Sequence, residues 1–186
     1  DNKKGKIGVV KMKEIFRYGL ILGLICVVAS GFLAGVNYLT KDRIIAQAKE
    51  EEDISLKEVM PQAEYFEPIK SQKEIIYYKA KDSNGNLLGV AFKASGKGYS
   101  SVIDTMVGME KDGTITAIKV LSQNETPGLG ANVEQKPFTA QFKYKKIQNL
   151  DVQVQAITGA TISSKTVIDS VQKKAEEIKE LIKDGK

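Results

Sequence analysis

The sequence contains no histidine and one cysteine, Cys26, among its 186 residues. Without histidine, neither a Ser-His-Asp nor a Cys-His catalytic arrangement can form, and the common zinc sites lose essential ligands. A single cysteine cannot form a disulfide within one chain. The sequence therefore predicts no catalytic side chains and no metal site, and it excludes a disulfide scaffold.

Excess positive charge is scarce beyond the first seventeen residues. The chain has a formal net charge of +5, of which residues 1–17 contribute +4 and the other 169 residues only +1. A nucleic-acid-binding protein carries its basic excess on the folded surface. We therefore expect no nucleic-acid partner, and we interpret residues 1–17 as a basic tail.

Charged side chains are absent from residues 18–39, which read YGLILGLICVVASGFLAGVNYL. As a helix, this segment spans roughly 33 Å, enough for the core of a lipid bilayer. A buried helix of a soluble protein is disfavoured because the segment has no polar face. A cleaved signal peptide is disfavoured because the apolar run is longer than usual for one. We expect a transmembrane helix at 18–39.

The flanks of this segment differ in charge. Within fifteen residues, six Lys and Arg side chains precede it and three follow it. The positive-inside rule then places the N-terminus in the cytoplasm and the C-terminal part outside the cell membrane.

Residues 40–61 continue in a helical pattern as a connector that Pro61 ends. Period-two patterns follow, and they predict one hairpin at 74–94 and another at 100–122, with turns at Asn84-Gly85 and Asp112-Gly113. The FTAQF stretch predicts a short helical turn. Alternation in LDVQVQAI predicts a fifth strand, with one face formed by Val152, Val154 and Ala156.

An apolar stripe predicts a closing helix from about Thr161 to Lys183, and its residues are Ile168, Val171, Ala175, Ile178 and Ile182. The predicted fold class is α+β: one N-terminal transmembrane helix, then an external domain at 62–186 with a mainly antiparallel sheet and flanking helices.

The sequence QAITGATISSK, residues 155–165, lies where the predicted fifth strand meets the closing helix. Free amides at a helix N-terminus favour an anion, usually phosphate. Gly159 and Ala160 leave room for its approach, and Lys165 adds positive charge. Hydroxyl donors are available from Thr158, Thr161, Ser163 and Ser164. The alternative is an ordinary helix cap, but a cap needs one hydroxyl and this segment offers four.

The tetrad from Thr158 to Thr161, followed by Ile162-Ser163-Ser164, resembles the flavinylation motif of the FMN-binding domain family. In that family the last Thr is esterified to the phosphate of FMN by a separate flavin transferase, which implies covalent FMN at Thr161. The sequence ETPGLG, from Glu125 to Gly130, resembles the second signature of the family. The resemblance also assigns Gly98 and Tyr99 to the flavin site.

For the flavin ring, ETPGLG offers suitable groups. Pro127 stiffens the loop, Gly128 and Gly130 allow close backbone approach, and Leu129 offers an apolar face. The resemblance implies that Glu125 and Thr126 hydrogen-bond polar ring edges. The alternative reading is an ordinary Pro-Gly turn.

With one span before the domain, the chain most resembles the G subunit of the Rnf electron-transport complex, and next the C subunit of the sodium-translocating NADH:quinone reductase. The first resemblance implies a relay of electrons between ferredoxin and NAD among other membrane subunits, coupled to ion movement. Because the span carries no charge, we do not expect this subunit to move ions itself. Because it has no histidine, redox thiol or second cofactor motif to act on a substrate, we expect an electron relay that is not catalytic alone. The alternative from another class is a membrane-anchored module that binds an anion or flavin noncovalently, or a purely structural domain.

Overall fold

The computed structural model describes residues 2–71 and 74–183, with side chains from residue 12 onward. Asp1, from the expected basic tail, and residues 184–186, from the expected external domain, lie outside the described residues. The chain forms two compact units, residues 1–50 and 51–186, which we describe separately.

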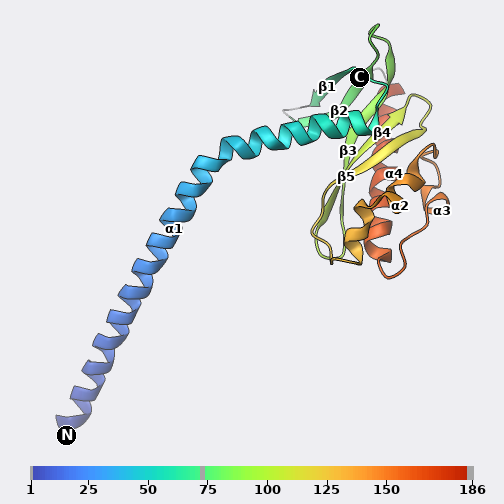
Figure 1. The fold of residues 1–186 in the computed structure, drawn as a ribbon. Coiled ribbons are helices and arrows are strands. Elements are labelled where there is room, and N and C mark those ends of the chain that lie inside the picture. The colour runs from blue at the N-terminus through green and yellow to red at the C-terminus, as the bar shows by residue number, and fades with distance from the viewer. Residues whose placement is uncertain (1, 72–73, 184–186) are drawn as a thin grey trace. The chain divides into compact units, whose positions relative to one another are not determined.

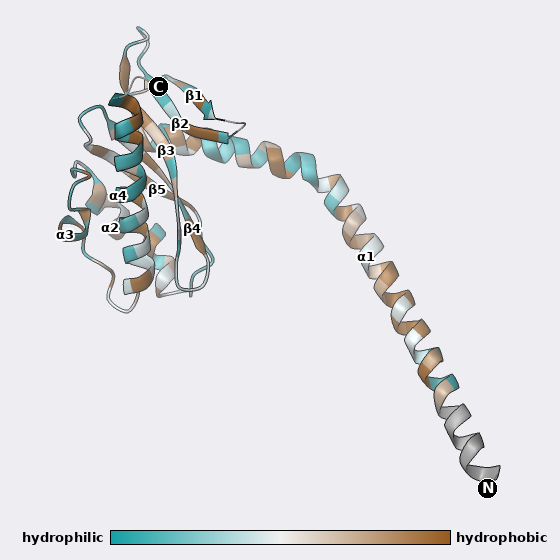
Figure 2. Cartoon of the chain, turned by 180° about the vertical axis from the view of Figure 1, so that it is seen from behind, coloured by the Kyte–Doolittle hydropathy of each residue, from teal (hydrophilic) through white to brown (hydrophobic). Residues whose placement is uncertain are grey.

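Helix α1, Asn2–Val59, contains all of the first unit's described residues and enters the second. Among the described residues it is the one helix long and apolar enough to cross a membrane. Figure 2 shows its apolar stretch in brown and the more polar stretch toward Val59 in teal. The predicted helix through 18–39 and the connector is thus confirmed as far as Val59, two residues before Pro61.

The second unit is built on a five-stranded antiparallel sheet in the order β1-β2-β3-β4-β5 (Figure 1). This meander and its flanking helices confirm the α+β prediction. The strands are β1 Tyr65–Ser71, β2 Glu74–Lys81, β3 Leu87–Lys97, β4 Val102–Glu110 and β5 Ile115–Ser122.

Both predicted hairpin turns are present. Gly85 (φ 81°) and Gly113 (φ 87°) occupy left-handed positions that other residues rarely adopt. In the first turn, the Asp82 carboxylate accepts hydrogen bonds from the amides of Asn84 and Asn86. The turn chemistry therefore sets the register of both hairpins.

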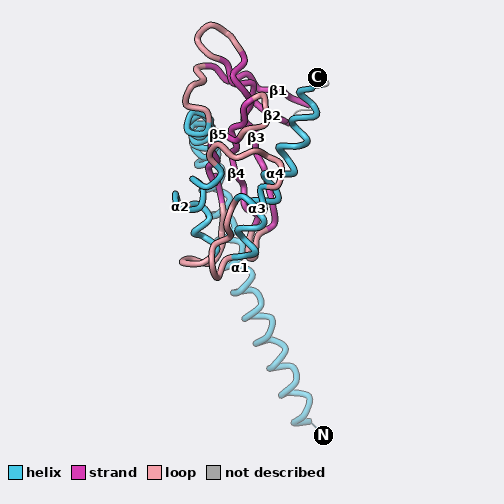
Figure 3. The backbone as a smooth tube through the Cα atoms, turned by 90° about the vertical axis from the view of Figure 1, so that its right-hand side faces the viewer, coloured by secondary structure: helices cyan, strands magenta, loops and turns pink. Residues whose placement is uncertain are grey.

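Alternation along the strands divides the core between the two faces of the sheet. Tyr77 belongs to the larger cluster, and Tyr78 to a smaller one on the opposite face. Helix α4, Thr161–Lys183, runs beside the sheet (Figure 3). Its buried residues Val167, Ile168, Val171, Ala175 and Ile178 belong to the larger cluster. The smaller cluster is covered by the end of α1, where Leu56 and Val59 are buried.

The short elements between β5 and α4 form an irregular layer over the same face as α4. They are η1 Gly130–Glu134, α2 Lys136–Thr139, η2 Ala140–Phe142 and α3 Leu150–Gln153. The predicted helical turn at FTAQF is confirmed by α2 and η2. Phe138 and Phe142 meet edge to face, with ring centroids 5.5 Å apart, and anchor this layer in the core.

The predicted fifth strand at residues 150–157 is wrong, because this segment begins with α3. Val154 is 3% exposed but Val152 is 81% exposed, so the two do not share a buried face. The Gln172 side chain on α4 accepts a hydrogen bond from the Leu150 amide, and Gln153 donates to nearby carbonyls. The amides of Val152 and Val154 bond to carbonyls of the same turn, and the Gln155 amide bonds to the Gln141 side chain, so these backbone groups are satisfied without a strand partner.

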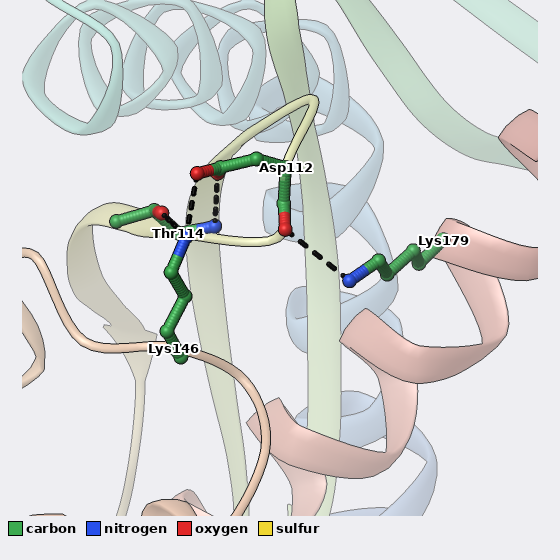
Figure 4. Close-up of polar contacts among 4 residues, drawn as sticks. All are labelled: Asp112, Thr114, Lys146 and Lys179. Atoms are coloured by element: carbon green, nitrogen blue, oxygen red, sulfur yellow. Dashed lines mark hydrogen bonds and ion pairs between the residues drawn. The ribbon is translucent and has the colours of Figure 1, made fainter.

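A clasp on the surface holds the β4–β5 turn to the segments beside it (Figure 4). The Asp112 carboxylate pairs with Lys146 at 2.5 Å and accepts a hydrogen bond from the Thr114 amide. Lys179, on α4, donates to the Asp112 carbonyl at 3.2 Å. Hydrogen bonding from Lys146 lowers the pKa of Asp112 well below its usual value.

Candidate flavin site

The two sequence motifs lie side by side around a cavity of about 540 Å³, within the size range of small-molecule sites. A Cβ added to Gly159 would lie 3.3 Å from the Leu129 side chain, which shows how closely the two loops approach. The cavity is lined by Tyr99, Glu125, Thr126, Leu129, Gly130, Gly159, Ala160, Thr161, Ile162 and Ser163. Six expected site residues are not among these: Gly98, Pro127, Gly128, Thr158, Ser164 and Lys165.

Helix α4 begins at Thr161, so its N-terminus faces the cavity. Gly159 adopts φ 82° in the turn before it, and the first backbone bond of the helix runs from the Ser164 amide to the Ala160 carbonyl. The amides of residues 161–163 precede that bond and lack acceptors within the helix. The helix dipole adds partial positive charge at the same point.

The four hydroxyls of the motif divide into two pairs. Ser163 and Ser164 are buried, and each has a protein partner: Ser163 donates to Glu125, and Ser164 accepts from the Ile157 amide. Thr158 and Thr161 are exposed, and neither side chain has a hydrogen-bond partner among the described residues. Of these two, Thr161 lines the cavity, so its hydroxyl is the one available to a ligand there.

The second motif begins with a type II turn. Its bond runs from the Leu129 amide to the Thr126 carbonyl, with Pro127 and Gly128 (φ 74°) in the central positions. This arrangement matches the Pro-Gly turn considered as the alternative reading, and it presents Leu129, which is 47% exposed, to the cavity.

Glu125 is 5% exposed, and its carboxylate accepts five hydrogen bonds from protein groups. Three come from the amides of Tyr99, Ser100 and Ser101, at 2.9–3.1 Å. The other two come from the hydroxyls of Ser101, at 3.1 Å, and Ser163, at 2.6 Å. Burial alone raises the pKa of this carboxyl, but the hydrogen bonds outweigh burial and lower the pKa to about 2. Glu125 is therefore ionised at neutral pH.

Two glycines of the site are explained by Glu125. A Cβ on Gly98 would lie 2.7 Å from Glu125 Oε1, and one on Gly130 would lie 2.8 Å from Glu125 Oε2 and 2.6 Å from Ser163 Oγ. All three distances are under 3.0 Å, which is shorter than the contacts that real Cβ atoms make, so a side chain at Gly98 or Gly130 would displace its neighbours. Gly128, by contrast, has open space around it and is required only for its turn conformation.

Sequence reasoning did not place Ser100 and Ser101 at the site. The available signal was Glu125 itself, the sole acidic residue between Asp112 and Glu134. A lone carboxylate in a loop shows that an acceptor is present, but it does not identify Ser100 and Ser101, which donate to it from 24–25 residues upstream.

The residues present fit an FMN group. The exposed side chains of Tyr99, Leu129 and Ile162 provide apolar walls for a flat aromatic ring. The start of α4 provides unpaired amides and the Thr161 hydroxyl for a phosphate. The ionised Glu125 is buried and also lines the cavity, and its carboxylate already accepts hydrogen bonds from protein groups.

Comparison with known proteins gives two family matches. Residues 98–176 match the FMN-binding domain, which contains the whole of the site, and residues 9–59 match the RnfG N-terminal region, which contains most of α1.

The curated relatives match over almost their whole length. The G subunit of the ion-translocating oxidoreductase complex of Methanosarcina acetivorans is 33% identical over 172 residues, covering 86% of this chain and 92% of the relative. The G subunit of the proton-translocating ferredoxin:NAD(+) oxidoreductase complex of Clostridium ljungdahlii is 31% identical, with coverages of 89% and 92%. The Na(+)-translocating counterpart of Acetobacterium woodii is 30% identical, with coverages of 87% and 90%.

Among solved structures, NqrC of Shewanella oneidensis is similar at 23% identity with a TM-score of 0.46, covering 65% of this chain and 73% of that one. The C subunit of the Na(+)-translocating NADH-quinone reductase of Parabacteroides distasonis aligns with a TM-score of 0.45 at 23% identity, with coverages of 55% and 60%. The family resemblance inferred from the motifs is confirmed by the family matches and by the curated relatives. The chain belongs to the family of G subunits of the ion-translocating Rnf oxidoreductase complexes, and its C-terminal part contains an FMN-binding domain.

Proposed function

We propose that this chain is the membrane-anchored flavin subunit of an Rnf complex, with FMN joined through its phosphate to Thr161. One observation carries the proposal. Thr161 is the first residue of α4, lines the cavity, and has no hydrogen-bond partner for its hydroxyl among the described residues, whereas Ser163 and Ser164 are buried and paired.

Attachment requires one phosphoryl transfer to Thr161. The Thr161 hydroxyl oxygen attacks the phosphorus of the flavin donor and loses its proton. A new P–O bond forms there, and the bond between that phosphorus and the leaving group breaks. The flavin donor is a nucleotide activated by such a leaving group, and a flavin transferase recognises the segment around Thr161. The free amides at the start of α4 then hold the remaining phosphate oxygens.

FMN, when bound, accepts and releases electrons, and the protein orients the ring and sets its potential. Tyr99, Leu129 and Ile162 limit contact between the ring and water. The relatives are named as ferredoxin:NAD(+) oxidoreductase subunits. By this likeness the protein relays electrons between other subunits of the complex, and its ester at Thr161 serves as an anchor rather than a catalyst.

The test is the intact mass and peptide map of the denatured chain, purified from its native membrane. We expect an FMN adduct on Thr161. Thr161→Ala removes the adduct, and Thr161→Ser, which keeps a hydroxyl, retains at least part of it. Ser83→Ala is the control, because Ser83 also carries an exposed hydroxyl but lies in the first hairpin turn, outside the motif and the cavity lining.

A different outcome would favour the noncovalent module. If wild-type Thr161 is unmodified in cells with an active flavin transferase, or if Thr161→Ala retains as much flavin after denaturation as the wild type, the covalent proposal is wrong. The relay itself is tested in the intact complex: reduced ferredoxin should bleach the flavin absorbance, and Thr161→Ala should abolish ferredoxin-dependent NAD reduction.

We further propose the topology that the charge pattern predicts: a cytoplasmic tail at 1–17, a span at 18–39, a helical connector at 40–61 and an extracytoplasmic domain at 62–186. Ser83 lies exposed in the first hairpin turn, so Ser83→Cys provides a site for a membrane-impermeant maleimide. In a Cys26→Ser background, we expect labelling of intact cells. Labelling only after lysis would place the domain in the cytoplasm.

A further inference from the structure

We propose that Glu125 is the positioning residue of the flavin site: its buried carboxylate joins three chain segments and thereby fixes the apolar walls around the ring. This inference rests on the proposed function to the extent that FMN occupies the cavity. It differs from the role that the family resemblance implied, in which Glu125 contacts the ring directly.

Three segments that lie far apart in the sequence meet at this side chain. Tyr99, Ser100 and Ser101 belong to the turn between β3 and β4, and Ser163 belongs to the first turn of α4. Glu125 itself follows β5 and precedes Ser163 by 38 residues. One carboxylate thus joins the segment after β5 both to the β3–β4 turn and to the start of α4.

Each of the three apolar wall residues either contacts Glu125 itself or is the neighbour in sequence of a residue that does. Tyr99 donates its own amide, Leu129 precedes Gly130, and Ile162 precedes Ser163. The three wall side chains are 47–72% exposed, so burial of their own does not hold them in place. Glu125 instead bonds to the Tyr99 backbone and the Ser163 side chain and packs against Gly130. The turn bond from the Leu129 amide to the Thr126 carbonyl also holds the Leu129 wall.

The packing around the carboxylate supports the same role. Gly98 and Gly130 bring their backbones so close that a Cβ at either would lie under 3.0 Å from Glu125 atoms. The backbone therefore closes in on Glu125 from two separate segments, and the lone pairs of the carboxylate serve the protein, not the ligand.

Glutamine is the informative replacement because it keeps the shape of the side chain and changes only its charge and donors. Oε2 accepts from the Tyr99 amide and Ser163, and Oε1 accepts from the Ser100 and Ser101 amides. Whichever oxygen becomes the NH2 group, it faces at least one backbone N–H, so at least one donor loses its acceptor.

The experiment compares three full-length variants with the wild type in detergent: Glu125→Gln, the milder Ser163→Ala, and the control Glu134→Gln. The Glu134→Gln substitution removes the same charge at an exposed position, where the Glu134 carboxylate accepts a hydrogen bond from the Gln123 side chain. Circular dichroism confirms that each variant is folded. Hydrogen exchange by mass spectrometry then follows the peptide containing residues 98–101, and visible circular dichroism with flavin fluorescence anisotropy follows the attached ring.

In Glu125→Gln we expect exchange in the 98–101 peptide to rise at least about tenfold, with lower anisotropy and an altered visible dichroism of the flavin. Ser163→Ala should give the same flavin changes with a smaller change in exchange. Glu134→Gln should match the wild type. Unchanged exchange and anisotropy in both Glu125→Gln and Ser163→Ala would overturn the positioning role.

The outcomes separate this inference from the proposed function. The exchange measurement needs no flavin, so it tests the role of Glu125 even if Thr161 carries no adduct. Conversely, an FMN adduct in every variant together with an unaffected ring would sustain the attachment at Thr161 and reject the role of Glu125.

Discussion

Ser163 donates a hydrogen bond of 2.6 Å to Glu125, and both side chains are buried. The bond joins the two flavin motifs directly, through protein groups alone. It also separates the hydroxyls of the TGATISS segment by role, because Ser163 and Ser164 hold the backbone whereas Thr161 faces the cavity.

The first prediction concerns acid sensitivity. The pKa of Glu125 is lowered to about 2 from its ordinary value of 4.5, so its ionised form stabilises the fold above about pH 4.5. That stabilisation is lost as the pH falls toward 2. Glu125→Gln should be less stable than the wild type at pH 6 by about 1–3 kcal/mol, and the difference should shrink with acid. Thermal melting from pH 6 to pH 2.5 measures it.

The wild type has to be compared with Glu125→Gln, because other carboxyl groups in the fold also have lowered pKa values and also contribute to acid sensitivity. The pKa values of Asp82, Asp104 and Asp112 are also lowered in the fold. Their contributions are common to both proteins and cancel in the difference. A stability gap that stays constant down to pH 2.5 would show that Glu125 is not the group with the lowered pKa.

The second prediction contrasts two glycines. Gly130→Ala forces a Cβ to 2.6 Å from Ser163 Oγ and 2.8 Å from Glu125 Cβ, so we expect a loss of about 2–3 kcal/mol and disordered flavin. Gly128→Ala has open space and suffers only from its positive φ, at about 1 kcal/mol. Urea unfolding of both variants tests the order. Equal losses would mean that the loop relaxes around the new methyl group.

The third prediction concerns Thr105 in β4. Its hydroxyl is fully buried and has no hydrogen-bond partner among the described residues. Because an unsatisfied buried hydroxyl is unfavourable, Thr105→Val should leave stability unchanged or raise it by about 1 kcal/mol. The midpoint of thermal unfolding measures the effect. Thr105→Ser, which keeps the hydroxyl and loses a methyl group, is the control and should destabilise the domain.

The fourth prediction concerns the clasp at the β4–β5 turn. Asp112 and Lys146 are both more than half exposed, so their pairing should contribute less than about 1 kcal/mol. A double-mutant cycle of Asp112→Asn and Lys146→Met measures the coupling, and salt at about 1 M should reduce it. A coupling that salt leaves unchanged would indicate that the neutral hydrogen bonds of the turn, rather than the charges, hold the clasp.

Local signals predicted much of the fold. The two hairpins and α4 carry strong signals, because Gly85 and Gly113 need positive φ and the stripe on α4 is regular. The strand prediction at 150–157 was wrong because a short alternation of apolar and polar residues resembles the pattern of a β-strand. The true structure of this segment depends on Gln172, a distant side chain on α4 that no local pattern reveals.

The strand that the sequence did not reveal was β1, whose sequence YFEPIKS alternates poorly and contains Pro68. Proline is tolerated there because β1 is an edge strand, whose one partner among the described strands is β2. In the site, the cavity-facing position of Thr161 was predictable, since a motif and a helix start coincide. The contacts of Glu125 were not, because they depend on donors 24–38 residues away in the chain.

The end of α1 is part of the second unit's own core. The Val59 carbonyl accepts a hydrogen bond of 2.6 Å from Thr116 and lies where a Cβ on Gly108 would clash. The folded domain thus begins before Pro61, at Glu51, where the division between the two units falls. A soluble fragment cut at Pro61 would lose Leu56 and Val59, which cover the smaller core cluster, so a fragment meant to fold alone has to keep the last turns of α1.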